Sequence, residues 1–355
     1  MTNIGIIGAG MIADVHAETA KRIGTNVVAV FDPRSKSAEN FATKHGCVHE
    51  VSVEALLARE DIDGVVVAVP NDQHAELAIA SMEAEKHVLL EKPMAMSLQE
   101  CNDILAARDA TGKVLQMGFV CRYSPAAIKA KNMIDQGDLG EIQHVQATLL
   151  RQRGIPGLGG WFTTKARSGG GCLIDIGVHL IDVVMHITSK TSPSRMRGKC
   201  TQQFTEKTYA YEEMWSTPKE GGTFDVEDRV WGLLTDESGT TFQFDVAWAT
   251  HLPDKTVKDR LLIEGSLGAL VVDLWNDSIT FGYSENGTPS TKVIDVSVVD
   301  AWEDAFDGEH KAFVRAMESG TLDHDAGSGE DGRLVQRIVE SVYASNTTSQ
   351  EVPVK

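Results

Sequence analysis

The chain contains 355 residues, of which 42% are hydrophobic, and it carries a formal net charge of −18 at pH 7. This length predicts two domains, and the acidic balance argues against binding to nucleic acid or an anionic membrane, both of which need clustered Lys and Arg. No apolar run reaches the ~18 residues of a membrane span. Five dispersed cysteines, without a Cys-x-x-Cys pair, predict reduced thiols in a cytoplasmic protein and no metal site.

Residues 1–120 alternate apolar runs with helical segments, and the connections between them are short. The predicted strands are Ile4–Ile7, Val27–Phe31, Gly64–Val69, His87–Leu90 and Val114–Gly118. The predicted helices are Met11–Arg22, Ser35–His45, Asp72–Glu85 and Ser97–Thr111. Because the strands are continuous apolar runs, helices should cover both faces of a parallel sheet. We therefore predict that residues 1–120 form a doubly wound Rossmann domain of the α/β class.

A glycine turn, Gly8-Ala9-Gly10, joins the first predicted strand to the first predicted helix. Gly8 permits the tight turn, Gly10 lets the backbone approach a pyrophosphate, and the small Ala13 allows the helix to pack closely on the strand. The anion is then expected on the free N–H groups at the start of the helix, around Met11 and Ile12. The spacing thus predicts a dinucleotide-binding turn.

Asp32 ends the second predicted strand. An acid at this place accepts hydrogen bonds from the adenosine ribose hydroxyls of NAD and repels the 2′-phosphate of NADP. NAD is therefore the predicted cofactor, although Arg34, two residues further on, softens the preference against NADP. The alternative is that Asp32 only forms a turn before Pro33.

Two further strand ends carry polar side chains, at the edge of the sheet where ligands of open α/β folds bind. Asn71 and His74 follow the third predicted strand, and Glu91 and Lys92 follow the fourth. We expect all four at the cofactor, with the Lys92 ammonium also donating to a substrate hydroxyl. The alternatives are a helix cap at Asn71 and an ordinary exposed lysine in a turn.

The pattern changes after residue 120. A predicted helix, Ser124–Gln136, and a long predicted strand, Ile142–Leu150, precede a series of strands without helices between them. These strands are Val230–Thr235, Thr241–Trp248, Arg260–Glu264, Ala269–Asp273 and Ser278–Phe281, and the closing helices are Trp302–Glu318 and Asp331–Ser345. The order predicts that residues 121–355 form an α+β domain with a mostly antiparallel sheet. One face of that sheet is expected to be free of helices and is a hypothetical oligomer contact.

Three glycines, Gly169–Gly171, close a glycine-rich loop and precede Asp175, His179 and Asp182. In a regular helix Asp175 and His179 share one face, and Asp182 lies one turn further on the same side. A neutral His accepts a proton near pH 7, and a nearby carboxylate orients it. Because glycines destabilise a helix, three of them suggest close approach to a ligand. The alternative is an Asp–His contact on the surface of the protein.

Taken together, these segments resemble the Gfo/Idh/MocA oxidoreductase family, and the resemblance covers essentially the whole chain. It rests on the motifs Gly8-x-Gly10-x-x-Ala13, Pro70-Asn71-x-x-His74, Glu91-Lys92-Pro93, Arg122-Tyr123-x-Pro125 and Gly169-Gly170-Gly171-x-Leu173-x-Asp175-x-Gly177-x-His179. One departure is Phe162, which follows Trp161 where many members have an Arg. The segment 151–157 is similar to a branch that includes glycoside 3-dehydrogenases.

The resemblance implies an NAD(P)-dependent reaction at a secondary hydroxyl of a sugar, polyol or glycoside, in a homodimer or homotetramer. It places Lys92, Asp175 and His179 in the active site. In the mechanism we expect, His179 accepts the hydroxyl proton, Asp175 orients the imidazole and Lys92 stabilises the emerging alkoxide. The predicted substrate contacts are Arg122, Tyr123, Arg151, Trp161 and Lys165.

Two other functions remain open at this level. Some relatives keep NAD bound and cleave a glycoside by elimination through a transient 3-keto sugar. A regulatory protein that senses a cofactor needs the glycine turn but does not need Lys92, Asp175 and His179 together, so the intact trio counts against that alternative.

Overall fold

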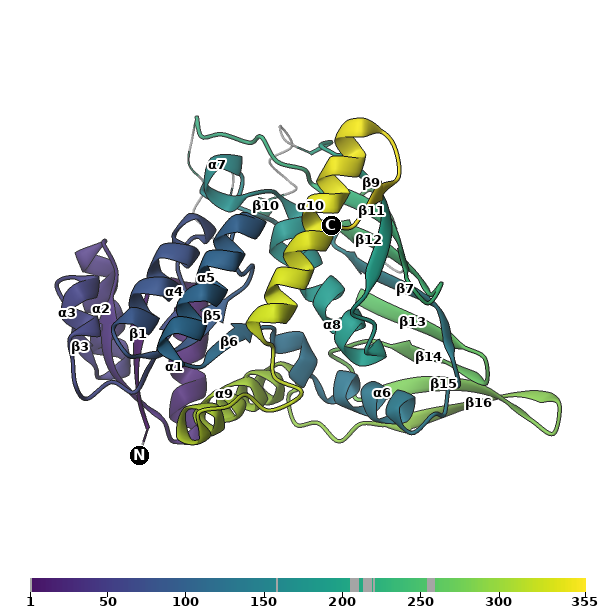
Figure 1. Ribbon diagram of the computed structural model, residues 1–355, viewed down its shortest axis with the longest axis horizontal. Helices are drawn as coiled ribbons and strands as arrows, with labels where there is room; N and C mark the ends of the chain where they lie inside the picture. Colours follow the sequence, from purple (N-terminus) through teal and green to yellow (C-terminus); the bar gives the residue numbers. More distant parts are fainter. Residues whose placement is uncertain (1, 158, 205–210, 213–218, 220, 254–258) are drawn as a thin grey trace. The chain divides into compact units, whose positions relative to one another are not determined.

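The computed structural model describes residues 2–157, 159–204, 211–212, 219, 221–253 and 259–355 (Figure 1). Contacts divide the chain into two compact units: residues 1–120 with 305–333, and residues 121–304 with 334–355. The sequence also divides at residue 120, but it had assigned 305–333 to the second domain. The contacts place that segment with the first unit.

The first unit contains a six-stranded parallel sheet with the strand order β3-β2-β1-β4-β5-β6. Its strands are β1 (Asn3–Ile7), β2 (Asn26–Phe31), β3 (Val48–His49), β4 (Gly64–Val67), β5 (His87–Glu91) and β6 (Leu115–Gly118). Its helices are α1 (Met11–Ile23), α2 (Ser35–His45), α3 (Val53–Leu57), the 3₁₀ turn η1 (Asn71–Gln73), α4 (His74–Glu83) and α5 (Leu98–Thr111). This is the Rossmann order, in which ligands bind beyond the carboxyl ends of the strands. The short β3 and α3 were not predicted.

Helix α9 (Ala301–Ser319) completes the core of the first unit from the far end of the chain. Its residues Phe313 and Ala316 are 1% and 0% exposed and belong to the same hydrophobic cluster as Ile6 of β1, Val30 of β2 and Leu89 of β5. Burial of a large apolar side chain such as Phe313 stabilises the fold by roughly 1.5–3 kcal/mol. The Rossmann unit is therefore not complete at residue 120.

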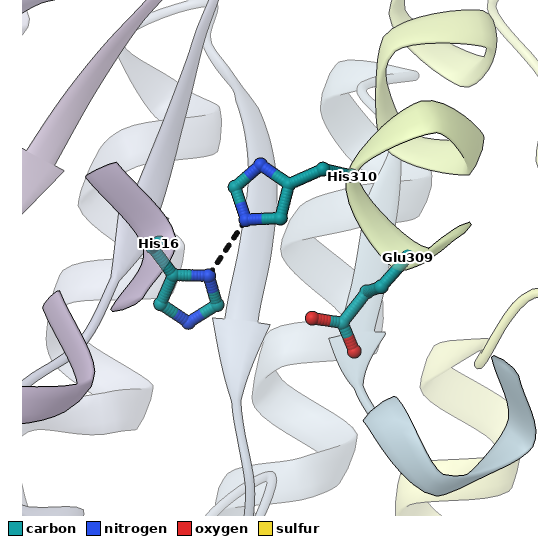
Figure 2. A group of neighbouring side chains, drawn as sticks. All are labelled: His16, Glu309 and His310. Atoms are coloured by element: carbon teal, nitrogen blue, oxygen red, sulfur yellow. Dashed lines mark hydrogen bonds between the residues drawn. The ribbon is translucent and has the colours of Figure 1, made fainter. Parts of the chain in front are cut away.

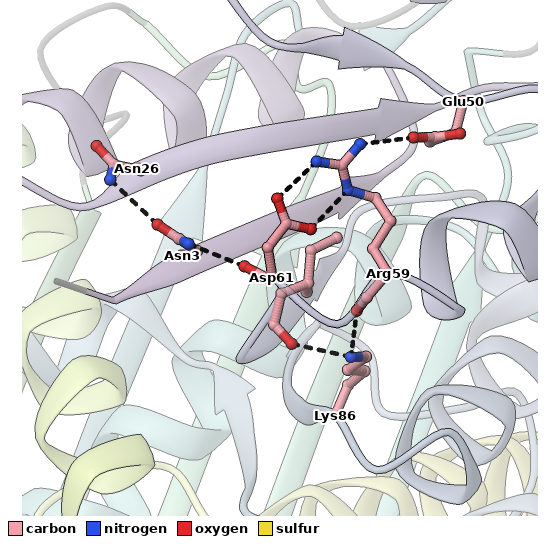
Figure 3. Close-up of polar contacts among 7 residues, drawn as sticks. Asn3, Asn26, Glu50, Arg59, Asp61 and Lys86 are labelled. Atoms are coloured by element: carbon pink, nitrogen blue, oxygen red, sulfur yellow. Dashed lines mark hydrogen bonds and ion pairs between the residues drawn. The ribbon is translucent and has the colours of Figure 1, made fainter.

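A polar network lies at the amino ends of several parallel strands and extends to Glu50, which follows β3 (Figure 3). The Arg59 guanidinium binds the carboxylates of Glu50 and Asp61. The Lys86 ammonium donates to the main-chain oxygen of Arg59, and Asn3 donates to that of Asp61. The amino edge of the sheet is thus occupied by structural contacts, which leaves the functional residues at the carboxyl edge.

The second unit contains a nine-stranded sheet with the order β16-β15-β14-β13-β7-β12-β11-β9-β17. Its strands are β7 (Ile142–Leu150), β9 (Pro193–Thr201), β11 (Arg229–Asp236), β12 (Thr241–Ala247), β13 (Asp259–Gly265), β14 (Gly268–Val272), β15 (Ser278–Glu285), β16 (Thr288–Asp295) and β17 (Val352–Pro353). Only β7 and β12 run parallel among its pairs. β8 (Ile155–Pro156) and β10 (Tyr211–Glu212) form a separate small parallel pair. The predicted fold class is confirmed, although β9 and β16 were missed.

The described helices of the second unit lie on one face of this sheet (Figure 1). They include the 3₁₀ turn η2 (Val120–Tyr123), α6 (Pro125–Asp135), α7 (Lys165–Ser168), the π-helical turn η3 (Leu173–Gly177), α8 (Val178–Thr188) and the second-unit part of α10 (Gly329–Thr348). Along β11, Val230 and Leu234 are buried, whereas the alternating residues Trp231 and Leu233 are half-buried and exposed. This period of two is what a sheet with one covered face requires.

One helical segment of the second unit differs from the expectation that no segment of the chain is long and apolar enough to span a membrane. Among the described residues, Lys165–Thr188 is long and apolar enough to cross a membrane by length and composition alone, and 83% of its most apolar window is buried inside the fold. A buried core helix passes the same test.

Candidate active site

The glycine turn has the geometry that a pyrophosphate needs. Gly8 has a φ of +109°, and a Cβ there would lie 2.2 Å from the carbonyl oxygen of Ala68, so only glycine fits. A Cβ on Gly10 would meet nothing within 4 Å. Gly10 is the N-cap residue of α1, and no side chain caps this end of the helix. The first N–H groups of α1, beginning at Met11, are therefore open to an anion.

Asp32 lies at the end of β2, only 5% exposed. Its carboxylate accepts hydrogen bonds from the Ala9 N–H at 2.9 Å and from the backbone and guanidinium of Arg34 at 2.9–3.0 Å. Burial by itself raises the pKa of Asp32, but the hydrogen bonds and charge of Arg34 outweigh it, so the pKa lies below its usual value. Asp32 therefore braces the glycine turn and stays ionised, as binding to ribose hydroxyls requires.

His74 and Asn71 follow β4, as predicted, and the His74 ring contacts the main chain. Its Nδ1 lies 2.7 Å from the Pro93 carbonyl oxygen and its Nε2 lies 3.0 Å from that of Val69, and the residue is 1% exposed. Both ring nitrogens face main-chain oxygens of the protein, so His74 joins the loops that follow β4 and β5, and its contact with the cofactor stays a prediction. Burial lowers the pKa of His74, which favours the neutral ring, and a neutral ring carries a single N–H that donates to one of these two oxygens. Asn71, 6% exposed, opens η1.

The Glu-Lys-Pro segment follows β5, and the Lys92–Pro93 peptide bond is cis. Glu91 is 7% exposed; its Oε1 lies 2.9 Å from His16 Nε2 and its Oε2 accepts the Lys92 N–H at 3.1 Å. The carboxylate therefore faces the interior of the first unit, and the contact of Glu91 with the cofactor stays a prediction. Lys92 itself is partly buried.

The second glycine run packs against protein. Gly169 has a φ of +83° and ends α7 in the left-handed region. A Cβ on Gly170 would lie 1.9 Å from the Tyr343 hydroxyl, and one on Gly171 would lie 1.8 Å from the carbonyl oxygen of Glu227. The inference that these glycines make room for a ligand is thus wrong for Gly170 and Gly171, because protein atoms fill that space.

Glu227, which the sequence did not single out, fixes the start of the segment that carries Asp175 and His179. Its Oε1 accepts the N–H groups of Gly171 at 2.9 Å and Leu173 at 3.1 Å, and the Tyr343 hydroxyl at 3.0 Å. Burial raises its pKa, although these donors act in the opposite direction. A local sequence pattern does not predict the role of Glu227, because its partners lie more than 50 positions away in the chain.

Asp175 lies in the π-helical turn η3, and His179 lies in the first turn of α8. Both are partly buried. The indole N–H of Trp248, itself 0% exposed, donates to Asp175 Oδ2 at 2.8 Å. The prediction of a common helix face assumed a regular α-helix, whereas a π turn carries about 4.4 residues and rotates the residues that follow it.

Asp182, predicted one turn beyond Asp175 and His179, pairs with Arg122. The guanidinium Nε donates to Oδ2 at 2.8 Å and Nη2 donates to Oδ1 at 2.6 Å. Arg122 and Asp182 are 4% and 1% exposed. This bidentate buried pair ties η2 to α8, a structural role that the sequence did not predict for Arg122.

The remaining predicted substrate residues differ in accessibility. Tyr123, Arg151 and Trp161 are partly buried and Lys165 is exposed. Trp161 stacks on Phe162 with ring centroids 3.7 Å apart, and the Lys165 ammonium lies 5.8 Å from the centroid of the Tyr343 ring. Their contacts with a substrate stay predictions.

Comparison with known proteins identifies both units. The profile described as "Oxidoreductase family, NAD-binding Rossmann fold" matches residues 2–119, and that of the "GFO/IDH/MocA C-terminal domain" matches residues 127–271. The chain belongs to the Gfo/Idh/MocA family of oxidoreductases. The resemblance inferred from the five motifs is thereby confirmed, and so is the expectation of an enzyme with an NAD-binding domain.

Several Gfo/Idh/MocA proteins are similar over most of their length. An Amycolatopsis mediterranei (strain S699) protein named for the oxidoreductase subunit of UDP-kanosamine synthase is 35% identical over 74% of this chain and 70% of its own. D-glucoside 3-dehydrogenase of Escherichia coli (strain K12) is 28% identical over 98% of this chain and 96% of its own. In fold, levoglucosan dehydrogenase in complex with NADH and levoglucosan has a TM-score of 0.87 at 21% identity, covering 99% of both chains.

The residues of the first unit fit a nicotinamide dinucleotide. Three independent features agree: the empty space at Gly10, the uncapped start of α1, and a buried, ionised Asp32 at the end of β2.

Proposed function

We propose that this Gfo/Idh/MocA protein is a dehydrogenase that oxidises a secondary hydroxyl of a sugar or glycoside, or reduces the corresponding ketone. The single observation that carries the proposal is the similarity to D-glucoside 3-dehydrogenase over 98% of the chain, combined with the presence of Lys92, Asp175 and His179 in this sequence. The similarity spans both units, so it includes the part of the chain outside the cofactor domain.

We propose NAD as the preferred cofactor, with NADP as the weaker one. Asp32 is ionised and buried at the position where a 2′-phosphate would approach, and two anions in contact repel each other. The Arg34 side chain is 68% exposed, so it is able to leave Asp32 when ribose hydroxyls take its place. In that position its guanidinium also offers a partner to a 2′-phosphate, which explains a residual use of NADP.

The proposed mechanism uses the three residues that the resemblance assigns to the active site. NAD, held by the glycine turn and Asp32, would supply the acceptor for the hydride that leaves the carbon bearing the hydroxyl. His179 accepts the hydroxyl proton, and the Lys92 ammonium stabilises the negative charge that develops on oxygen. Asp175 orients the His179 imidazole, and the Trp248 N–H holds one oxygen of Asp175 in a fixed direction.

Substitution of Lys92 tests this mechanism. Purified protein is first assayed with NAD and NADP against glucosides, aldoses, sugar acids and inositols, following NADH at 340 nm. We expect Lys92→Ala to lower kcat by about 10²–10³-fold on the substrate found, because one charge-stabilising donor is lost. Lys44→Ala is the control and should keep full activity, because Lys44 of α2 forms surface ion pairs with Asp14 and Glu18 of α1.

Two results would contradict the proposal. Retention of most of the activity by Lys92→Ala would remove Lys92 from the mechanism. Release of free sugar from a glycoside without net formation of NADH would assign the protein to the hydrolytic alternative.

We also propose a cytoplasmic homo-oligomer built on the helix-free face of the nine-stranded sheet. All five cysteines are free thiols, which supports a reducing compartment. The helix-free face carries Trp231 beneath the Arg229 guanidinium, 4.4 Å from its ring centroid, and Leu233, 46% exposed. A molar mass from light scattering that equals one chain would contradict this assembly.

A further inference from the structure

A buried chain of hydrogen-bonded side chains starts at Glu91 of the Glu-Lys-Pro segment and joins three elements of the first unit. Glu91 Oε1, at the end of β5, lies 2.9 Å from His16 Nε2 on α1. His16 Nδ1 lies 2.8 Å from His310 Nε2 on α9, as Figure 2 shows. His16, Glu91 and His310 are 0%, 7% and 1% exposed. The chain brings together residues almost 300 positions apart.

An ionised Glu91 and a neutral His16 together assign one direction to each hydrogen bond of this network. An ionised carboxylate only accepts, so His16 Nε2 carries the hydrogen that Glu91 receives. His16 Nδ1 is then the acceptor, and His310 Nε2 must donate to it. Burial lowers the pKa of His310 well below its ordinary value, which is consistent with a neutral donor. The Phe306 ring, whose centroid is 5.7 Å from that of His16, packs against its side.

A metal ion is the competing interpretation, because ligand atoms of His16, Glu309 and His310 lie within 4.8 Å of one another. Two nitrogens on one tetrahedral zinc, at Zn–N distances of about 2.0–2.1 Å, are about 3.3 Å apart. The nitrogens of His16 and His310 are 2.8 Å apart, which is a hydrogen-bond distance. The other nitrogen of His16 is already on Glu91. The geometry therefore favours the hydrogen-bonded chain.

We propose that His16 and His310 are positioning residues for the reaction, which act by holding the carboxylate of Glu91 and thereby the main chain at Lys92. The second oxygen of Glu91 accepts the Lys92 N–H at 3.1 Å, so rotation of the carboxylate moves the peptide that carries the Lys92 side chain. His74 holds the next carbonyl, that of Pro93, at 2.7 Å. This inference rests on the proposed role of Lys92.

Three variants of His16 and a matched control test the proposal. His16→Leu removes both ring nitrogens, and we expect kcat to fall by about 10–100-fold with little change in the Kd for NADH. His16→Gln places an amide N–H near the position of Nε2 and should restore most of the kcat. His16→Ala should behave as His16→Leu does. His45→Gln is the control, because His45 binds Asp14 at 2.7 Å in the same unit without contact to Glu91.

Comparison of the fall in kcat with the change in the Kd for NADH distinguishes a role in positioning Lys92 from a general loss of structure. The positioning role is wrong if His16→Leu lowers the Tm and weakens NADH binding by the same factor by which it lowers kcat. It is also wrong if His16→Gln is as impaired as His16→Leu. Lys92→Ala in the same assay tests the proposed function by itself. An inactive Lys92→Ala beside a fully active His16→Leu overturns only the present inference, whereas an active Lys92→Ala overturns both.

Nuclear magnetic resonance of the ¹⁵N-labelled imidazoles provides a readout that needs no substrate. We expect hydrogen on Nε2 and none on Nδ1 for His16, and a neutral ring with hydrogen on Nε2 for His310. Hydrogen on His16 Nδ1 would overturn the chain. So would one equivalent of zinc in the purified protein whose removal by a chelator shifts the His16 and His310 signals.

Discussion

The two glycine turns of this protein look alike in sequence and differ in what surrounds them. At Gly10, in the first unit, a Cβ would meet nothing within 4 Å. At Gly171, in the second unit, it would lie 1.8 Å from the Glu227 carbonyl oxygen. One turn leaves space for a ligand, and the other leaves space for the protein's own main chain. Glycine in a sequence reports close approach, but it does not tell whether a ligand or the fold makes that approach.

The largest expected effect on stability is at Gly171. Gly171→Ala places a methyl group against main-chain atoms that cannot move aside cheaply, so we expect a loss of about 3 kcal/mol or more in the free energy of unfolding, measured by urea denaturation. Gly282→Ala in β15 is the control, because its Cβ would meet its first neighbour at 4.0 Å. Equal stability of the two variants would show that the second turn is as open as the first.

A smaller, pH-dependent effect is expected at Glu227, which lies beneath the second turn. Burial raises its pKa in the folded protein, so the folded state binds the proton more tightly than the unfolded state. The stability that Glu227 gains from binding a proton is therefore present below its pKa in the unfolded state, and it is lost as pH rises through its pKa in the folded state. Glu227→Gln keeps an acceptor for the three donors and removes the titration.

Denaturation of both proteins at several pH values checks this sign. Stability of the native protein should fall relative to Glu227→Gln as the pH increases from 4 toward neutrality. A difference that does not vary with pH would contradict the raised pKa of Glu227.

The smallest effect on stability is expected at Gly10. Gly10→Ala should change the free energy of unfolding by less than about 1 kcal/mol, because the methyl group enters open space at a helix N-cap. The same methyl group occupies the place of the pyrophosphate, so binding of NADH, followed by fluorescence titration, should be lost. Unchanged affinity would show that the cofactor does not use this turn.

The first unit was largely predictable because its functional residues follow strand ends. Strand and turn patterns are local, so Gly8, Asp32, Asn71 and Lys92 were found at the carboxyl edge of the sheet where the sequence placed them. What the sequence did not give was the direction of each side chain. His74 was predicted at the cofactor, but its two ring nitrogens contact main-chain oxygens.

The second unit was less predictable because its decisive contacts are long-range. Glu227 reaches Gly171, Trp248 reaches Asp175, and Arg122 reaches Asp182, each across more than 50 residues. A single sequence contains no periodic signal for such pairs. The π-helical turn at Asp175 also lacks a signature that separates it from an α-helical turn, since Leu173, Ile174 and Ile176 give the same apolar pattern in either.

The return of α9 to the first unit bears on how this fold is able to recombine during evolution and in the laboratory. Residues 305–333 supply Phe313 to the core and a hydrogen bond from the Met117 N–H to the Gly327 carbonyl oxygen beside β6. A cofactor module exchanged between proteins at residue 120 alone would leave an apolar face uncovered. The transferable module is discontinuous, and both pieces must travel together.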